Sequence, residues 1–155
     1  MGESIFYGCS IKQSSFYLCS SLTEISIPPS INSIESSAFP GCCKLLKITI
    51  DPFKTHFELD TFEKCSSLHH FEFAKSVTTV RPFNFQLIGE ITEITIPDSV
   101  TSIEESAFSQ CPSLQSISFP STIESIERSS FEGCHLISKI TIDPYQTIIE
   151  LGSFE

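Results

Sequence analysis

The sequence predicts a mainly β fold in which the chain coils into a solenoid, with one parallel strand in each turn and a period of 23 positions. Two observations predict it: an unbroken column of phenylalanines, and further apolar columns in phase with that column. A unit this short cannot bury its own apolar face, so neighbouring units should stack and share one core. The phenylalanines lie at Phe16, Phe39, Phe62, Phe85, Phe108, Phe131 and Phe154.

A strand is expected in each unit where apolar and polar residues alternate. Ile117 and Phe119 flank Ser118, and the strand should end at Pro120, because proline has no N–H for the ladder. Neighbouring strands should lie about 4.8 Å apart. The predicted strands lie near residues 24–27, 47–50, 70–73, 93–96, 116–119 and 139–142.

The rest of each unit is expected to return the chain to the next strand. Residues 100–103 form a short second extended segment, and residues 106–108 form a tight turn. No segment has a long helical period with caps, so we expect only short 3₁₀ or α turns on this path. Residues 71–85 depart most from the repeat, because Pro82 and Phe83 replace the usual polar pair. We expect a local irregularity there.

The chain divides into residues 1–10, expected to be an irregular segment or a partial cap, and residues 11–155, a solenoid of about six turns. The sequence stops in mid-unit with no polar capping segment, so the last turn should be uncapped or truncated. An uncapped turn could join a second copy end to end. No apolar run is long enough to cross a bilayer, and the N-terminus does not resemble a signal peptide.

The phased pattern reads Leu-x-x-Ile-x-Ile-Pro-x-Ser-Val-x-Ser-Ile-x-x-x-Ala-Phe-x-x-Cys, most clearly in residues 22–42 and 94–111. It resembles the BspA-like leucine-rich repeats of bacterial surface proteins and of certain mucosal protists, over about residues 11–155. The resemblance implies a right-handed solenoid and, in several members, adhesion to host or extracellular-matrix proteins. It favours a cell-surface or secreted protein, whereas the missing signal peptide favours a cytoplasmic one.

The charge of the chain narrows the class of partner. A formal net charge of −10 disfavours nucleic acid and anionic membranes, which attract clustered Lys and Arg. The resemblance to BspA-like repeats implies a protein partner. The outward residues of the strands should form the contact surface, although a merely solvated sheet face with cross-strand pairs, such as Glu24 beside Lys47, is the alternative. The candidates are Glu24, Ser26, Lys47, Thr49, His70, Glu72, Glu93, Thr95, Ser116, Ser118, Lys139 and Thr141.

Two other columns carry reactive groups. Glu35, Glu58, Glu104, Glu127 and Glu150, interrupted by Arg81, are interpreted as a solvated edge, because one carboxylate per turn does not converge on a calcium ion. A column of cysteines is interpreted as buried structural thiols, because an isoleucine replaces one of them and stacked thiols lie too far apart for a relaxed disulfide. These positions are Cys19, Cys42, Cys65, Ile88, Cys111 and Cys134.

Catalysis finds little support in the sequence. The four histidines are scattered, and the six glycines form no nucleotide-binding motif. We therefore predict no catalytic, cofactor-binding or metal site. The predicted function is a non-enzymatic protein-binding module for adhesion or for interaction with host or extracellular proteins. The alternative is an intracellular scaffold or effector that assembles proteins.

Overall fold

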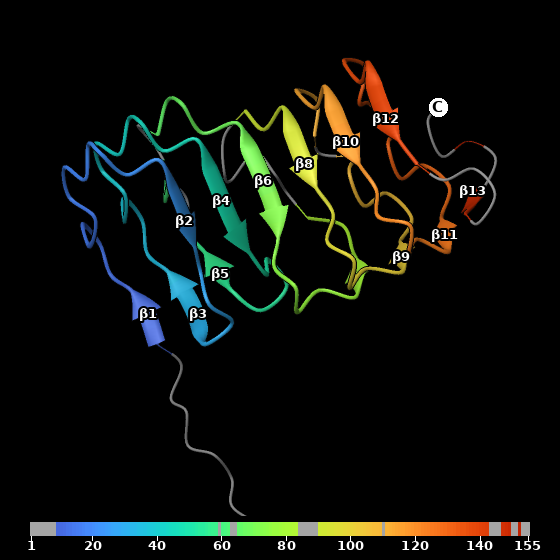
Figure 1. Ribbon diagram of the computed structural model, residues 1–155. Coiled ribbons are helices and arrows are strands. Elements are labelled where there is room, and N and C mark those ends of the chain that lie inside the picture. The colour runs from blue at the N-terminus through green and yellow to red at the C-terminus, as the bar shows by residue number, and fades with distance from the viewer. Residues whose placement is uncertain are drawn as a thin grey trace, which may run out of the picture.

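The computed structural model describes residues 9–58, 60–62, 65–83, 90–109, 111–142, 147–149 and 152. These residues form a stack of coils, with a strand on each side of most coils (Figure 1). They contain no helix, and hence none that could span a membrane. The return path uses single turns closed by bonds from residue i+3 to residue i, such as Cys42 N–H to the Phe39 carbonyl at 3.3 Å. The predicted mainly β solenoid is confirmed.

One side of the solenoid is a parallel sheet of six strands, which run in the order β12-β10-β8-β6-β4-β2. Each residue pairs with its equivalent in the next repeat, as Ile25 pairs with Ile48 and Ile48 with Phe71. The predicted strands are confirmed, most of them one residue shorter than expected. They are β2 (Glu24–Ser26), β4 (Lys47–Ile50), β6 (His70–Phe73), β8 (Glu93–Thr95), β10 (Ser116–Ser118) and β12 (Lys139–Thr141).

The other side carries the second extended segments, which form two sheets. β1 (Cys9–Ile11), β3 (Ile31–Ile34) and β5 (His56–Phe57) form the first sheet. The second sheet contains β7 (Thr79–Val80), β9 (Ser102–Ile103), β11 (Ser125–Ile126) and β13 (Ile148–Ile149). The interruption between β5 and β7 lies in the stretch that departs most from the repeat. β1 spans the expected boundary between residues 10 and 11.

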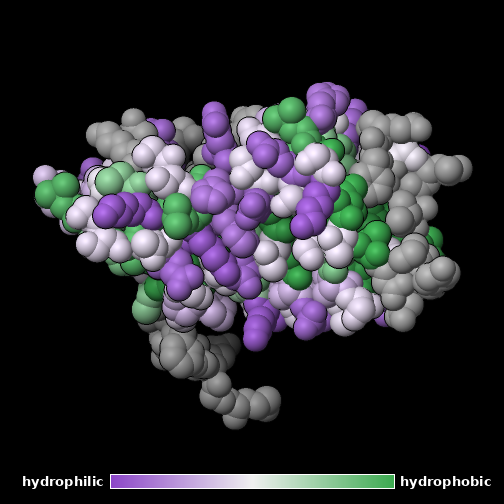
Figure 2. All heavy atoms as spheres, turned by 45° about the horizontal axis from the view of Figure 1, so that its top comes forward, coloured by the Kyte–Doolittle hydropathy of each residue, from purple (hydrophilic) through white to green (hydrophobic). Residues whose placement is uncertain are grey.

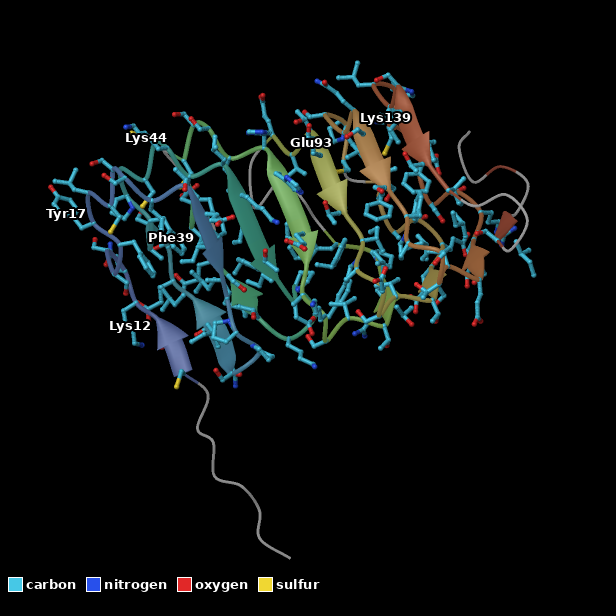
Figure 3. The ribbon with its side chains drawn as sticks, viewed as in Figure 1. Lys12, Tyr17, Phe39, Lys44, Glu93 and Lys139 are labelled. Atoms are coloured by element: carbon cyan, nitrogen blue, oxygen red, sulfur yellow. The ribbon has the colours of Figure 1, made fainter. Side chains whose placement is uncertain are left out.

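The core is a set of internal columns between the two sides. The rings of Phe16 and Phe39 stack with centroids 4.6 Å apart, and those of Phe39 and Phe62 with centroids 4.9 Å apart. Phe108 and Phe131 stack in the same way at 4.9 Å. Phe39 lies between the sheets (Figure 3) and is 1% exposed. The predicted stacking is confirmed for these five rings, while Phe85 and Phe154 lie outside the described residues.

A left-handed backbone residue recurs two positions before each stacked phenylalanine. In the irregular turn this position is occupied by Phe83, and its φ is not positive. A bulky aromatic side chain disfavours that conformation, and Pro82 restricts the residue before it to extended values. This substitution pair accounts for the expected irregularity, which the interrupted sheet confirms. The column contains Ser14 (φ 59°), Ser37 (47°), Asp60 (63°), Ser106 (59°), Ser129 (52°) and Gly152 (81°).

Candidate functional site

The twelve candidate residues form two parallel rows on the outward face of the six-stranded sheet. Each row crosses all six strands, because equivalent residues pair directly from strand to strand. Hydrophilic side chains gather across the middle of the face shown in Figure 2, and hydrophobic ones lie toward its C-terminal end. One row is Glu24, Lys47, His70, Glu93, Ser116 and Lys139, and the other is Ser26, Thr49, Glu72, Thr95, Ser118 and Thr141.

The middle of this face is held by bonds between its own side chains. Lys47 forms an ion pair with Glu72, and the Thr49 hydroxyl donates to the same carboxylate at 3.0 Å. Burial alone would raise the pKa of Glu72, but these two donors outweigh it and hold the pKa below its usual range. Glu24 and Lys47 lie opposite each other on β2 and β4, as the alternative of a solvated face expects, but the Lys47 ammonium pairs with Glu72 on β6.

His70 continues this network toward the C-terminal strands. Its Nε2 lies 2.8 Å from the Thr95 hydroxyl, and its Nδ1 lies 3.7 Å from a carboxylate oxygen of Glu93. Burial lowers the pKa of His70, and the nearby Lys47 charge lowers it further, whereas Glu93 and Glu72 raise it. The net effect is a lowered pKa, so the imidazole is neutral at pH 7.

A small hollow of about 140 Å³ lies beside this network, over β8, β10 and β12. Its middle is low because Ser116 has a short side chain where the other strands carry Glu, Lys or His, and Ser118 beside it is short as well. Glu93 and Lys139 project near the starts of β8 and β12 (Figure 3), so opposite charges flank the hollow. Seven of the twelve candidates line it: His70, Glu93, Thr95, Ser116, Ser118, Lys139 and Thr141.

The glutamate column has a structural role that the sequence interpretation missed. Three of its carboxylates reach back one turn, and each accepts a backbone N–H. Glu35 accepts from Gln13 at 3.0 Å, and Glu58 accepts from Ser36 at 2.9 Å. Glu127 accepts from Glu105 in the same way, at 3.0 Å. The constant spacing between donor and acceptor could have indicated this, but nothing in the sequence shows which way the side chains turn.

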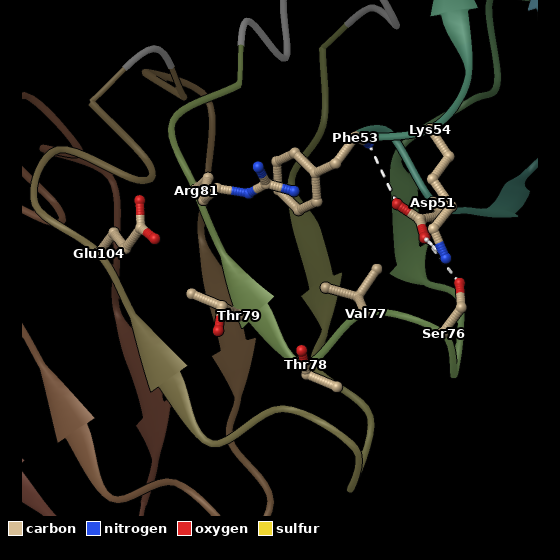
Figure 4. Close-up of a pocket in the computed structure, with 9 residues that line it drawn as sticks. All are labelled: Asp51, Phe53, Lys54, Ser76, Val77, Thr78, Thr79, Arg81 and Glu104. Carbon is tan, nitrogen blue, oxygen red and sulfur yellow. Dashed lines mark hydrogen bonds and ion pairs between the residues drawn. The ribbon is translucent and has the colours of Figure 1, made fainter.

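Proline interrupts this series at the irregular turn. Glu104 would accept the N–H of residue 82, but Pro82 has none. One turn earlier the column holds Arg81, whose guanidinium carbon lies 4.7 Å from the centroid of the Phe53 ring. Among the described residues, no side chain donates to or pairs with the Glu104 carboxylate. Arg81, Phe53 and Glu104 line a hollow of about 450 Å³ (Figure 4).

The cysteine column lies in the interior, as predicted, with Cys42, Cys65, Cys111 and Cys134 buried and Cys19 half-buried. The thiol of Cys134 donates to the Phe108 carbonyl one turn back at 3.1 Å. Burial raises the pKa of Cys111 to about 12 and that of Cys134 to about 11, so both stay protonated at neutral pH. Ile88 lies outside the described residues. Within those residues no cluster of three or more His, Cys, Asp or Glu side chains could hold a metal ion.

The chain is similar to known repeat proteins. Six copies of the BspA type leucine rich repeat region match residues 7–88 and 78–155. A leucine-rich repeat protein from Bacteroides ovatus has a crystal structure that is 33% identical, with a TM-score of 0.52, over 82% of this chain and 32% of that one. A leucine rich cell surface protein from Faecalibacterium prausnitzii is 26% identical, with a TM-score of 0.52, over 80% of this chain and 33% of that one.

This chain spans about a third of the length of those two proteins. No curated protein matches it. The repeat matches nevertheless cover nearly the whole chain, and the coils agree with them in period and register. The chain therefore belongs to the BspA-type leucine-rich repeat family.

Proposed function

We propose that this chain is a non-enzymatic protein-binding module whose partner docks on the outward face of the six-stranded sheet. Leucine-rich repeats generally mediate protein–protein interaction. The observation that carries the proposal is the hollow over β8, β10 and β12, where Glu93 and Lys139 flank a floor of serines. A hollow with opposite charges on its rim suits a polar protein surface, because complementary charges steer association and fix its register.

The proposed role is adhesion, at a cell surface or after secretion. The similarity to a cell surface protein of Faecalibacterium prausnitzii supports this role, as does the family. The alternative is an intracellular scaffold, which the cysteines favour, because none of the seven is in a disulfide. Counting free thiols in the unfolded natural protein separates the two. Seven free thiols favour the intracellular role, and fewer favour export.

The test is a pull-down against extracellular-matrix proteins with a face variant and a matched control. The face variant is Glu93→Lys with Lys139→Glu, which reverses both rim charges and keeps the net charge. The control is Lys12→Glu with Glu35→Lys, which reverses an ion pair of 2.7 Å on the opposite side of the solenoid. We expect the face variant to lose matrix proteins that the wild type and the control retain. Equal retention by all three contradicts the proposal.

We further propose that two copies can associate end to end through the last described turn. Ile140 is 39% exposed there, whereas its equivalents Ile94 and Ile117 in the two preceding turns are buried, so this turn leaves an inward apolar column open. Sedimentation of the wild type should show a concentration-dependent dimer that Ile140→Lys abolishes. A monomer at every concentration would remove this proposal and leave the sheet-face proposal intact.

A further inference from the structure

The departures from the repeat converge on one place, on the side of the solenoid opposite the proposed protein-binding face. Asp51 stands in a column that holds alanine or proline in the next three turns and aspartate again at Asp143. Phe53 stands in a column that holds serine or threonine in those turns and an aromatic residue again at Tyr145. Arg81 replaces a glutamate. All three side chains line the same hollow of about 450 Å³, which is the size of a small-ligand site (Figure 4). Because Arg81 is the only arginine in its column, this hollow is not a feature that the repeat itself produces.

The carboxylate of Asp51 on one wall of this hollow already has hydrogen-bond and ionic partners within the protein. Asp51 is 3% exposed, and its carboxylate accepts the Phe53 N–H at 3.1 Å and the Ser76 hydroxyl at 2.7 Å. The ammonium group of Lys54 lies 3.5 Å from the same carboxylate. Asp51 therefore fixes the positions of Phe53, Lys54 and Ser76, and its charge is compensated locally.

The cation at the centre of the hollow is held in place but not neutralised. The Arg81 guanidinium lies over the Phe53 ring, with 4.7 Å between its central carbon and the ring centroid. This contact orients the planar group without using its N–H donors. No carboxylate pairs with Arg81 anywhere in the described chain. A guanidinium that is fixed against an aromatic face and keeps its donors free is suited to a planar anion.

The backbone beside Arg81 is open as well. In other coils on this side, the backbone N–H of the residue that follows the strand donates a hydrogen bond to a carbonyl of the preceding coil. Examples are Glu58 N–H to the Ile34 carbonyl and Glu104 N–H to the Val80 carbonyl. The equivalent bond from Arg81 to Phe57 is missing, and both segments, 55–58 and 78–81, are described in full. The hydroxyls of Thr78 and Thr79 line the same wall. Side-chain and main-chain donors therefore border one hollow.

We propose that this hollow binds a carboxylate group, which the Arg81 guanidinium holds by two parallel hydrogen bonds, with Lys54 and the threonine hydroxyls beside it. A carboxylate fits better than a phosphate, because Glu104 also lines the hollow and repels a dianion more strongly than a monoanion. The carboxylate can come from a free organic acid or from an acidic side chain of a peptide, since both present the same planar group.

The test is a titration of the isotope-labelled chain, followed by NMR. The sequence has only two arginines, Arg81 and Arg128, so their side-chain N–H signals can be told apart by substitution. The probes are butyrate, the blocked peptide acetyl-Gly-Glu-Gly-amide, and inorganic phosphate; the first two carry a single carboxylate. We expect saturable shifts of the Arg81 side-chain signal and of the Thr78 and Thr79 amides with butyrate or with the peptide. The probe that saturates first identifies the source of the carboxylate.

Two variants and one control decide the outcome. Arg81→Gln should weaken binding at least about tenfold, because it removes a charge-assisted bidentate contact. Glu104→Gln should tighten binding, because it removes a repelling charge from the hollow. The control Arg128→Gln should leave binding unchanged, and circular dichroism should confirm that each variant is folded. The proposal is overturned by absence of saturable shifts, by stronger binding of phosphate, or by weaker carboxylate binding in Glu104→Gln.

Discussion

At the scale of the residue, left-handed backbone positions determine where each coil can bend. One column holds Ser, Asp or Gly at positive φ, and a second column holds Leu18 at 52°, Gly41 at 82° and Gly133 at 80°. Serine and aspartate tolerate this conformation better than bulky residues, and glycine adopts it without a steric penalty. The small and polar residues of the first column therefore meet a backbone requirement, whereas the second column also accepts Leu18.

Gly133 offers a clean measurement of this requirement. A Cβ added there would meet only the Ser109 carbonyl oxygen at 3.8 Å, which is ordinary contact, so the penalty is conformational alone. We expect Gly133→Ala to lower the free energy of unfolding by about 1 kcal/mol, as measured by denaturant titration. Gly133→Asn should lose clearly less, because asparagine enters the left-handed region more readily. Equal losses for the two variants would contradict this explanation.

His70 should titrate in a way that reports its neighbours. Its pKa lies below the ordinary value of 6.5, so the folded state favours the neutral ring. Its contribution to stability is therefore present above pH 6.5 and is lost as the pH falls through the lowered pKa. In NMR titrations the pKa of His70 should rise in Lys47→Gln and fall further in Glu93→Gln. A pKa that does not change in either variant would show that the pairing is not electrostatic.

At the scale of the element, the sequence predicts the strands well and the edges poorly. Strand positions follow from alternation and from columns such as Ile48 and Phe71, because burial on one face leaves a period in the sequence. The capping of Ser36 by Glu58 leaves no such mark, since a glutamate column is equally expected on a solvated edge. Around Arg81 the sequence predicts an irregular turn but not a hollow. The hollow depends on which residues of neighbouring turns come together, and that is set by how the turns stack.

The capping role of the glutamates predicts a difference between two chemically identical substitutions. Glu127→Ala removes the acceptor for the Glu105 N–H and should lower the free energy of unfolding by up to about 1 kcal/mol. Glu104→Ala removes no such bond, because Pro82 has no donor, and should cost much less. Denaturant titration of the two variants side by side checks this, and equal losses would assign the effect of Glu127 to its charge instead of its hydrogen bond.

At the scale of the whole molecule, contacts are made almost entirely between neighbouring coils. Each strand of the large sheet pairs only with the strands one repeat before and one repeat after it. Stability should therefore be close to a sum over coils and their interfaces, which is the behaviour of quasi-one-dimensional repeat proteins. The fold was predictable from the sequence for the same reason, because each core column recurs in every repeat. A binding surface for a partner occurs only once, so it produces no periodic pattern in the sequence.

Removing one complete unit tests this view. Deleting residues 116–138 joins Gln115 to Lys139 and keeps every column in phase, because the deleted segment is one whole repeat. We expect a folded, shorter solenoid with reduced stability and an unchanged type of circular dichroism spectrum. Deleting residues 116–136 instead shifts every later column by two positions and should prevent cooperative folding. Equal behaviour of the two deletions would contradict the columnar core.

The interruption between β5 and β7 has a mechanical consequence. The bonds between coils lie roughly along the axis of the stack, so tension applied to the two ends loads them in series and should peel the coils apart one at a time. The interface between residues 55–58 and 78–81 lacks the ladder that joins the other second extended segments, so these two coils depend on the β4–β6 ladder and on the core. Under a stretching force the molecule should yield there first and separate into two shorter rods.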